Sequence, residues 1–234
     1  MKNLDFSPGT MLAPVPVIMA TCGTAAGRKN IITIAWTGIV NTDPPMTYIS
    51  VREDRCSYRL ICENRTFAIN LVTEELVWAA DWCGVRSGRE YDKFRETGLH
   101  WITAKTGVPL LEESPLRLEC CVRQDIPLGT HHMFLAEIVN VSVQETLLDE
   151  TGRLRLDRAG LVAWNHGEYF RLQKMPLGKF GFSVMKEKTK RRMRKQTAGH
   201  RKQTAGHRKQ TAGHRKQTAG YQKSRREKGK RQDR

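Results

Sequence analysis

Apolar and polar residues alternate most regularly in the segment from Leu116 to Arg123. The apolar positions are Leu116, Leu118, Cys120 and Val122, and between them lie Arg117, Glu119, Cys121 and Arg123. A period of two is typical of a β-strand with one buried face. The segment is therefore predicted to be a strand that is buried on one face, and it is the clearest strand in the chain.

Other apolar runs predict further short strands and a few helices. Runs of strand-like composition cover residues 16–22, 46–51, 67–72 and 133–143. Helical spacing is found over residues 58–64, 74–82 and 91–97, with Ser57 placed as the N-cap of the first helix, and residues 149–152 are typical of a turn. Many short strands with two or three inserted helices predict a mainly β fold, a small β-barrel rather than a βαβ repeat.

The C-terminal segment consists largely of a seven-residue repeat. Arg194–His200, Arg201–His207 and Arg208–His214 are identical, and Arg215–Tyr221 differs only in its last residue. Alanine is the sole apolar residue of each unit, so the repeat lacks the hydrophobic seam of a coiled coil and cannot offset the entropy of ordering. We therefore expect a folded domain over residues 1–189 and a disordered basic tail over residues 190–234.

The positive charge of the chain is concentrated at the same end. Residues 186–234 hold 20 Lys and Arg against 3 Asp and Glu, a net charge of +17, whereas residues 1–185 hold 20 against 21, a net charge of −1. A strongly basic balance usually indicates nucleic acid or an acidic membrane as the partner. Here that inference applies to the tail alone, which is a candidate for weak, non-specific nucleic-acid binding.

The cysteines and the N-terminal segment bear on where the protein works. The six cysteines form no Cys-x-x-Cys pair and no zinc-module spacing, which favours reduced thiols in a cytoplasmic protein. Pro8, Pro14 and Pro16 interrupt the first apolar run, unlike a signal peptide. Because no segment approaches the roughly 20 apolar residues of a membrane span, we expect a cytoplasmic protein without a membrane partner.

Four polar clusters follow one another in the first hundred residues. They are Asn30–Gly38, Ser50–Arg52 with Ser57 and Tyr58, Phe67–Leu71, and Ser87–Phe94. A flavin phosphate is a compact dianion, so its site needs hydroxyl groups, backbone N–H groups and a cation that converge. The isoalloxazine ring needs an apolar slot with a few well-placed donors. The clusters supply these groups, and together they suggest a cradle for one flavin mononucleotide (FMN).

With these clusters in this order, the chain resembles the flavoredoxins and the wider family of flavin reductase-like, FMN-binding split-barrel proteins. The likeness extends from about Pro14 to Val184. It rests on Asn30–Gly38, Ser50–Arg52, Asn70, Ser87–Arg89, Asp92–Leu99, Gly129–His131 with Phe134 and Glu137, and Leu177–Ser183. Each motif is weak by itself, but the ordered set is a strong signal.

The resemblance implies a split β-barrel that forms a homodimer and holds FMN noncovalently near the subunit boundary. Asn30 and Trp36 would then flank the ring system, and the backbone from Ala35 to Gly38 would donate to its polar edge. The residues that the resemblance places at the flavin are Asn30, Thr33, Ala35, Trp36, Thr37, Gly38, Ser50, Arg52, Ser57, Tyr58, Asn70, Lys93, His131 and Trp164.

The same resemblance assigns the phosphate to Ser57, Arg52 and Lys93. As an N-cap, Ser57 would lie where helix N–H groups meet the phosphate, and the two cations would neutralise it. Each residue also has a plainer explanation, since most lysines and arginines are solvated charges and a serine can cap a helix without a ligand. Trp36 on a strand is often a core residue, and Trp164 can be covered for structural reasons alone.

The two adjacent histidines, His131 and His132, have different expected environments. His131 corresponds to the histidine of the family's Gly-Asp-His stretch, and Thr130 takes the place of the aspartate. His131 and His132 would point to opposite faces of a strand, so they are not expected to share a metal ion. No metal site is predicted.

The sequence therefore predicts a flavin-dependent oxidoreductase. It has no Gly-x-Gly-x-x-Gly motif after a strand and no P-loop, so an NAD(P)H donor would have to dock transiently over the flavin. The sequence leaves open whether the protein is a reductase of a flavin or ferric acceptor or a carrier between redox protein partners. The alternative is a polyanion-binding protein that uses the basic tail, with the barrel as a dimerising scaffold.

Overall fold

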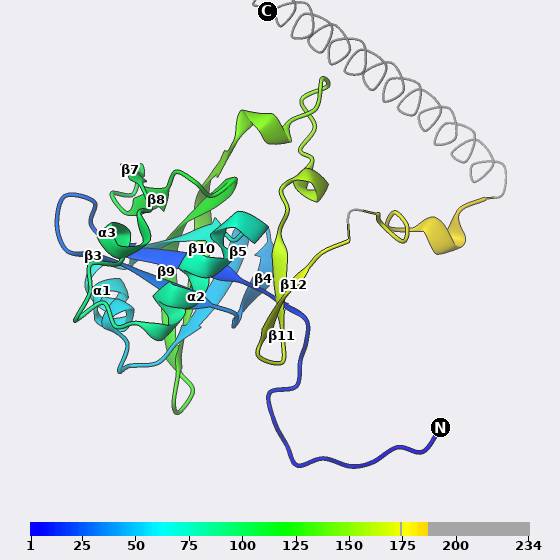
Figure 1. The fold of residues 1–234 in the computed structure, drawn as a ribbon, viewed down its shortest axis with the longest axis horizontal. Coiled ribbons are helices and arrows are strands. Elements are labelled where there is room, and N and C mark those ends of the chain that lie inside the picture. Colours follow the sequence, from blue (N-terminus) through cyan, green and yellow to red (C-terminus); the bar gives the residue numbers. More distant parts are fainter. Residues whose placement is uncertain (174, 187–234) are drawn as a thin grey trace, which may run out of the picture. The chain divides into compact units, whose positions relative to one another are not determined.

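The computed structural model describes residues 1–173 and 175–186 (Figure 1). The chain divides into two compact units, Met1–Lys174 and Met175–Arg234. In the second unit the described part contains the 3₁₀ helix η4 (Phe182–Val184). The predicted domain boundary at residue 189 and the predicted tail over 190–234 lie outside the described residues.

The first unit is built on a seven-stranded antiparallel sheet with the strand order β3-β2-β6-β9-β10-β5-β4 (Figure 1). Its strands are β2 (Ile18–Gly23), β3 (Lys29–Ile34), β4 (Thr37–Thr42), β5 (Pro45–Val51), β6 (Thr66–Leu71), β9 (Leu116–Pro127) and β10 (His132–Val143). Two small sheets complete it, one of β1 (Val15–Pro16), β11 (Val162–Asn165) and β12 (Glu168–Arg171), the other of β7 (Trp101–Thr103) and β8 (Pro109–Leu111).

The helices are short and few. They are α1 (Cys56–Asn64), α2 (Val77–Val85) and α3 (Lys93–Thr97), with 3₁₀ helices η1 (Glu74–Leu76), η2 (Glu145–Leu147) and η3 (Leu156–Arg158). The predicted mainly β fold with a few helices is confirmed. Within the described ranges, no helix has the length and hydrophobicity needed to cross a bilayer.

Strand β2 is buried along its whole length because both faces of the sheet are covered there. Ile18 and Ala20 belong to one core cluster, which helix α1 joins through Leu60. Met19 belongs to a second cluster, which helix α2 joins through Ala80. A strand that is covered on both faces has a nearly continuous apolar sequence, so its position is not predicted by alternation of apolar and polar residues.

The two longest strands, β9 and β10, match the predicted segments, but β9 is covered at Glu119 on the face that a strand with one buried face would leave open. Glu119 is 1% exposed. Its carboxylate accepts hydrogen bonds from the N–H and the hydroxyl of Thr106 at 3.0 and 3.1 Å and from the Asn140 amide at 2.8 Å. The loop between β7 and β8 covers this face of β9, which the local pattern could not show.

The structure also corrects two local predictions at the polar clusters. Ser57 is not the N-cap of α1: Arg55 holds that position and makes no side-chain cap. The helix begins earlier than predicted because a turn from Arg52 to Arg55 leads directly into it, closed by the Arg55 N–H donating to the Arg52 carbonyl at 3.1 Å. Trp36 does not lie on a strand but in the bend between β3 and β4.

Other element boundaries shift slightly. The predicted strand over 16–22 is divided between β1 and β2, and the predicted helix over 74–82 is the 3₁₀ turn η1 followed by α2. Helix α3 begins at Lys93 rather than Tyr91, because Asp92 caps it by accepting from the N–H groups of Phe94 and Arg95. Strands β3, β4, β7, β8, β11 and β12 had no separate prediction.

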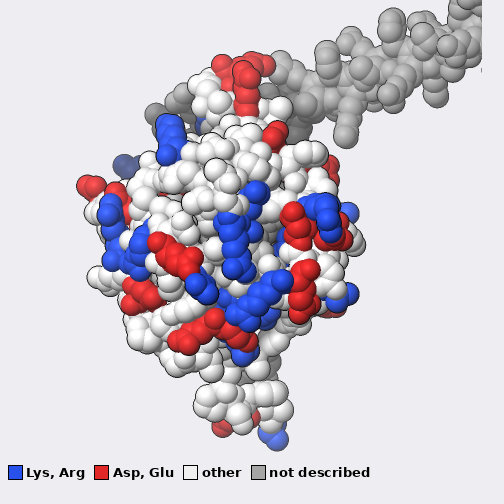
Figure 2. All heavy atoms as spheres, turned by 90° about the vertical axis from the view of Figure 1, so that its left-hand side faces the viewer, with Lys and Arg blue, Asp and Glu red and all other residues white. Residues whose placement is uncertain are grey.

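The cysteines and the surface charges are distributed over several elements of the first unit. All six cysteines are free, and burial raises the pKa of Cys22 to about 12 and that of Cys83 to about 11. On the face of the molecule seen in Figure 2, basic and acidic side chains are interspersed over the described residues. This mixture agrees with the small net charge of residues 1–185.

Candidate functional site

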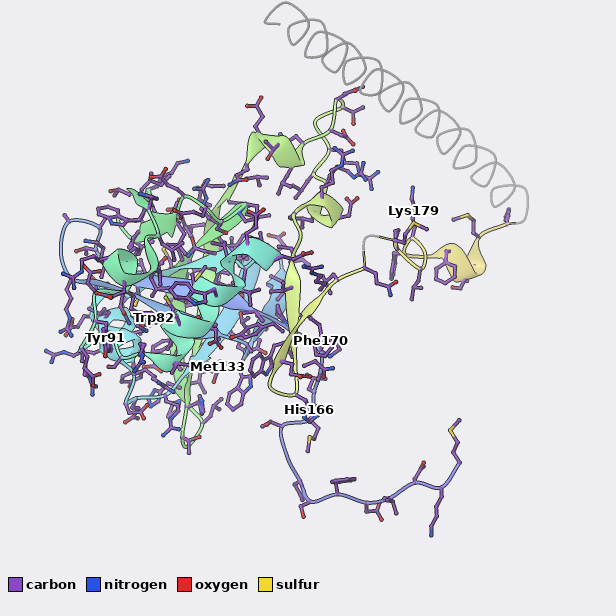
Figure 3. All side chains as sticks on the ribbon, in the orientation of Figure 1. Trp82, Tyr91, Met133, His166, Phe170 and Lys179 are labelled. Carbon is purple, nitrogen blue, oxygen red and sulfur yellow. The ribbon has the colours of Figure 1, made fainter. Side chains whose placement is uncertain are left out.

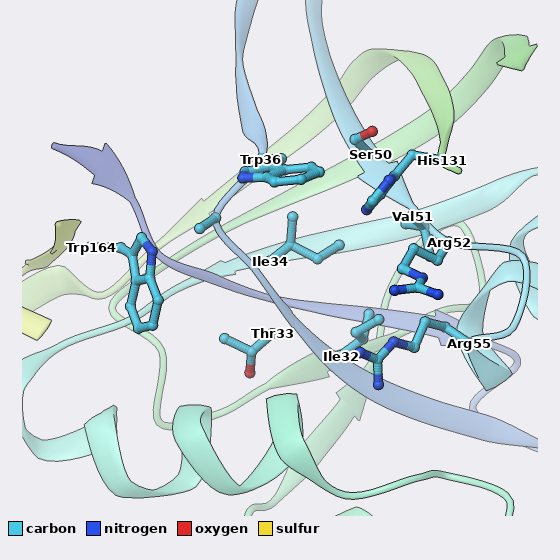
Figure 4. Close-up of a pocket in the computed structure, with 11 residues that line it drawn as sticks. Ile32, Thr33, Ile34, Trp36, Ser50, Val51, Arg52, Arg55, His131 and Trp164 are labelled. Atoms are coloured by element: carbon cyan, nitrogen blue, oxygen red, sulfur yellow. The ribbon is translucent and has the colours of Figure 1, made fainter. Parts of the chain in front are cut away.

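A cavity of about 310 Å³ opens beside the ends of β3 and β5 (Figure 4). Its lining comes from residues 32–36 on β3 and the following bend, residues 50–52 at the end of β5, and Arg55, His131 and Trp164. Segments far apart in the sequence therefore meet at one opening, because β5 and β10 pair side by side and β11 reaches the same region from the C-terminal part of the unit.

One end of the cavity is apolar and aromatic. Trp36 and Trp164 border this end together with Ile34, which lies beside Trp36 in Figure 4. Trp36 is 45% exposed and packs on the His131 ring, with the ring centroids 4.5 Å apart. Trp164 packs edge-on against Tyr169 at 5.0 Å. Both tryptophan rings border the opening, and each is held in place by contact with a neighbouring aromatic ring.

The other end is cationic, and Arg52 and Arg55 lie there in Figure 4. Both belong to the turn that leads into α1. Asp54 lies between the two guanidinium groups, 3.3 Å from that of Arg52 and 3.9 Å from that of Arg55. One carboxylate against two guanidinium groups leaves an excess of positive charge, which favours an anion.

A second, smaller cavity of about 70 Å³ shares two lining residues, Ile32 and Arg55, with the first. Lys93 lines it and is only 4% exposed. The ammonium group donates to the carbonyl groups of Ile31 at 2.8 Å and Cys83 at 2.6 Å. Burial lowers the pKa of Lys93. An ammonium group has three donors, and two of them have these described partners.

The segment after α2 comes very close to β3 at the small cavity. The Asn30 amide donates to the Ser57 hydroxyl at 2.9 Å, and a side chain at Gly88 would collide with that amide. Trp82 and Tyr91, labelled in Figure 3, hold the segment by an edge-to-face contact at 5.6 Å. Glycine at position 88 therefore allows the backbone to approach Asn30.

The structure brings together nine of the predicted site residues and separates the others. Thr33, Ala35, Trp36, Ser50, Arg52, His131 and Trp164 line the larger cavity, and Asn30 and Lys93 line the smaller one. Thr37, Gly38, Ser57, Tyr58 and Asn70 line neither. Trp36, Ser57 and Lys93 thus do not surround one common cavity within the protomer.

The residues outside the cavities have structural partners of their own. The Asn70 side chain donates to the Met19 carbonyl at 2.9 Å and accepts from the Leu111 N–H at 2.9 Å, which ties β6 to β2 and β8. The Thr37 hydroxyl donates to the Tyr48 carbonyl at 2.6 Å and so joins β4 to β5. The polar character of these residues reflects buried backbone groups that need partners.

The sequence prediction omitted several lining residues. Arg55 borders both cavities and Arg86 borders the smaller one. Arg55 could have been found, because it follows Arg52 by three residues in a turn. Arg86 gave no local signal, since only the packing of α2 against β3 brings it there.

His131 is a neutral ring at the border of the larger cavity. Burial, followed by the nearby Arg52, lowers the pKa of His131, so its ring is neutral at pH 7 where it packs on Trp36. Among residues 1–173 and 175–186, His, Cys, Asp and Glu side chains form no group of three or more that could hold a metal ion.

The antiparallel, barrel-like sheet places the protein in the class of the split-barrel flavin proteins. A cavity with an aromatic end and a cationic end is consistent with this class. The chain belongs to the family described as flavin reductase like domain, whose model matches residues 10–173. The resemblance drawn from the ordered motifs is therefore confirmed.

Individual relatives agree with this assignment. Flavoredoxin of Desulfovibrio vulgaris (Miyazaki F) superposes with a TM-score of 0.72 at 27% identity, covering 78% of this chain and 100% of that one. Flavoredoxin from Methanosarcina acetivorans gives a TM-score of 0.72 at 23% identity, covering 79% and 100%. The FMN reductase (NADH) RutF of Pseudomonas syringae pv. syringae (strain B728a) is 27% identical over 105 residues, 45% of this chain and 57% of that relative.

Proposed function

We propose that the two adjoining cavities hold one FMN noncovalently and that the protein is a flavin-dependent oxidoreductase of the flavoredoxin and flavin reductase type. The observation that carries this proposal is that one cavity is lined by aromatic residues at one end and by arginines at the other. The volume of about 310 Å³ lies within the usual range for small-molecule sites. The family assignment supports the same ligand class.

The lining residues suggest how FMN would be held. Ile32, Ile34 and the two tryptophans would contact the ring, and Arg52 and Arg55 would bind the phosphate, which prefers guanidinium partners. Lys93 would add a donor from the smaller cavity. When bound, FMN supplies a ring that accepts a hydride or electrons. The protein positions this ring, excludes water from its apolar side and neutralises its phosphate.

Electrons would come from NAD(P)H or from a reduced protein partner and would leave to a flavin, a ferric complex or a protein acceptor. The name of the Pseudomonas relative, an FMN reductase that uses NADH, supports the first donor. The similarity to flavoredoxin of Desulfovibrio vulgaris (Miyazaki F) supports a carrier role. We further propose a homodimer in which the partner subunit borders the cavity.

The visible absorption spectrum of the purified full-length protein tests the cofactor. We expect a yellow protein, or a colourless one that takes up added FMN, with unmodified FMN released on denaturation. Anaerobic addition of NADH and then NADPH identifies a nicotinamide donor by bleaching. A protein that contains no flavin and binds none would contradict the proposal.

Replacing Arg52 with Gln tests the cationic end. The substitution removes a charged hydrogen-bond donor from a partly exposed site, so FMN affinity should fall by about tenfold. Fluorescence titration of the flavin-free protein measures this change. Arg59→Gln is the matched control, because Arg59 is exposed and pairs with Glu63 on the surface of α1 at 2.6 Å. Equal affinities for the two variants would remove Arg52 from the proposed site.

Steady-state and partner assays separate the two modes of electron transfer. Continuous oxidation of NADH or NADPH with free FMN or a ferric complex would indicate a reductase. Bleaching of the bound flavin only by a reduced redox protein would indicate a carrier.

A further inference from the structure

A polar cluster at the start of β10, outside both cavities, centres on His132. Its Nδ1 lies 2.8 Å from Asp125 Oδ1 on β9, and its Nε2 lies 2.6 Å from Glu53 Oε1 in the turn after β5. Helix α1 adds the Tyr58 hydroxyl, 3.3 Å from Nδ1, and the Cys62 thiol, which donates to Asp125 Oδ2 at 3.9 Å. The imidazole therefore bridges three elements.

The carboxylates of Asp125 and Glu53 determine which protonation state of His132 this geometry requires. An ionised carboxylate only accepts hydrogen bonds, and a neutral imidazole has a single N–H donor. His132 can donate to Asp125 and Glu53 together only as an imidazolium ion. In agreement, the hydrogen bond to Asp125 and then that to Glu53 raise the pKa of His132 above its usual value.

Glu53 links this cluster to the cationic end of the larger cavity. It lies in the Arg52–Arg55 turn, between Arg52 and Asp54, and the turn is closed by the backbone bond from Arg55 to Arg52. Asp54 faces the two guanidinium groups, whereas Glu53 reaches back to β10. Movement of Glu53 would therefore move the arginines on either side of Asp54.

We propose that His132 is a positioning residue: its bond to Glu53 fixes the Arg52–Arg55 turn, so that protonation of His132 sets how the two arginines face the phosphate of the bound flavin. The proposal rests on the proposed FMN site for its functional consequence and on the described contacts for the linkage itself. Its chemistry requires a phosphorylated ligand and one proton at His132.

The direction of the pH effect follows from the raised pKa of His132. Below this pKa the imidazolium holds both carboxylates, and the bond is lost as the pH rises through it. The Glu53 side chain is 62% exposed, against 25% for Asp125, so water can replace the imidazole at Glu53 more easily. On deprotonation the remaining N–H stays with Asp125, and the turn is released.

The experiment compares the full-length protein with Glu53→Gln and with Glu63→Gln. Glu63 is a partly exposed glutamate on α1 that pairs with Arg59 and not with His132, so Glu63→Gln is the matched control. Flavin-free protein is titrated with FMN from about pH 6.5 to about pH 8.5, above the second pKa of about 6 of a phosphate monoester. The signals of the His132 ring and of the Arg52 and Arg55 Nε–H groups are followed by NMR over the same range.

In the unsubstituted protein, FMN affinity should fall about three- to fivefold as His132 loses its proton, which is the range of a partly exposed ion pair. Glu53→Gln should begin weaker by a similar factor, show a flat profile and lower the pKa of His132. Glu63→Gln should behave like the unsubstituted protein. The arginine signals should follow the His132 titration except in Glu53→Gln.

Two results would overturn the proposal: identical pH profiles with and without Glu53, or arginine signals that do not respond to the His132 titration. Absence of FMN binding at every pH would instead contradict the proposed function. In that case the NMR signals alone still decide whether His132 controls the turn.

Discussion

Lys93 has a structural role in the core, and its proposed binding role depends on the same side chain. Its ammonium group bonds the carbonyl groups of Ile31 on β3 and Cys83 on α2, so it joins the sheet to the helix that covers it. A buried charge without such partners would be costly. The same group borders the smaller cavity, and the position of the cation is therefore set by the core before any ligand arrives.

Replacement of Lys93 by Met should affect both roles. Two buried carbonyl groups would lose a charged donor, so the free energy of unfolding should fall by about 1–3 kcal/mol, measured by urea denaturation. FMN affinity should fall as well, by about tenfold. Lys105→Met is the control, since Lys105 is exposed and its loss should leave both quantities unchanged. Full stability in Lys93→Met would show that the two carbonyl bonds contribute nothing.

The β7–β8 hairpin is held to the main sheet by Glu119. The carboxylate on β9 accepts from the backbone and hydroxyl of Thr106 and from Asn140 on β10. The loop also buries Ala104 and Val108 in a small cluster with Ala68 and Leu110. The Glu119 carboxylate is thus buried because the β7–β8 hairpin packs on strand β9.

Glu119→Ala should loosen this hairpin. Three donors would lose their acceptor, so the free energy of unfolding should fall by about 2–3 kcal/mol. Limited proteolysis should cut the loop near residues 104–107 sooner than in the unsubstituted protein. Glu63→Ala, which removes an exposed i,i+4 pair, should cost at most about 0.5 kcal/mol. Equal protease resistance of both variants would contradict the pinning role of Glu119.

The net positive charge of the chain comes from its C-terminal residues. Residues 186–234 have a net charge of +17 and residues 1–185 a net charge of −1. All residues of this chain that line the proposed flavin site lie in the unit Met1–Lys174. Electron transfer and polyanion binding are therefore expected to be separable properties of the chain.

Removal of residues 190–234 tests this separation. The far-UV circular dichroism of the body and its FMN affinity should not change, because no residue of the proposed site is removed. Binding to duplex DNA at low salt should disappear, and in the full-length protein it should weaken steeply between two salt concentrations. A large loss of helical signal would contradict the predicted disorder of this segment.

Local patterns in the sequence determined the main strands and helices, since β9, β10, α1 and the 46–51 strand follow from periodicity and composition alone. Motif order determined the family, because four polar clusters in a fixed sequence are unlikely to occur together by chance. The repeat and its charge also needed no structure. These features depend on neighbours along the chain.

Only the tertiary structure decided which polar residues meet. Asn70 and Ser57 belong to the motifs but bond within the core, whereas Trp36 and Trp164 come from segments distant in sequence and line one cavity. Burial of Glu119 and the bridge at His132 likewise depend on contacts between elements. A side chain's partners are fixed by packing in three dimensions, and residue type by itself does not distinguish a ligand contact from a buried backbone partner.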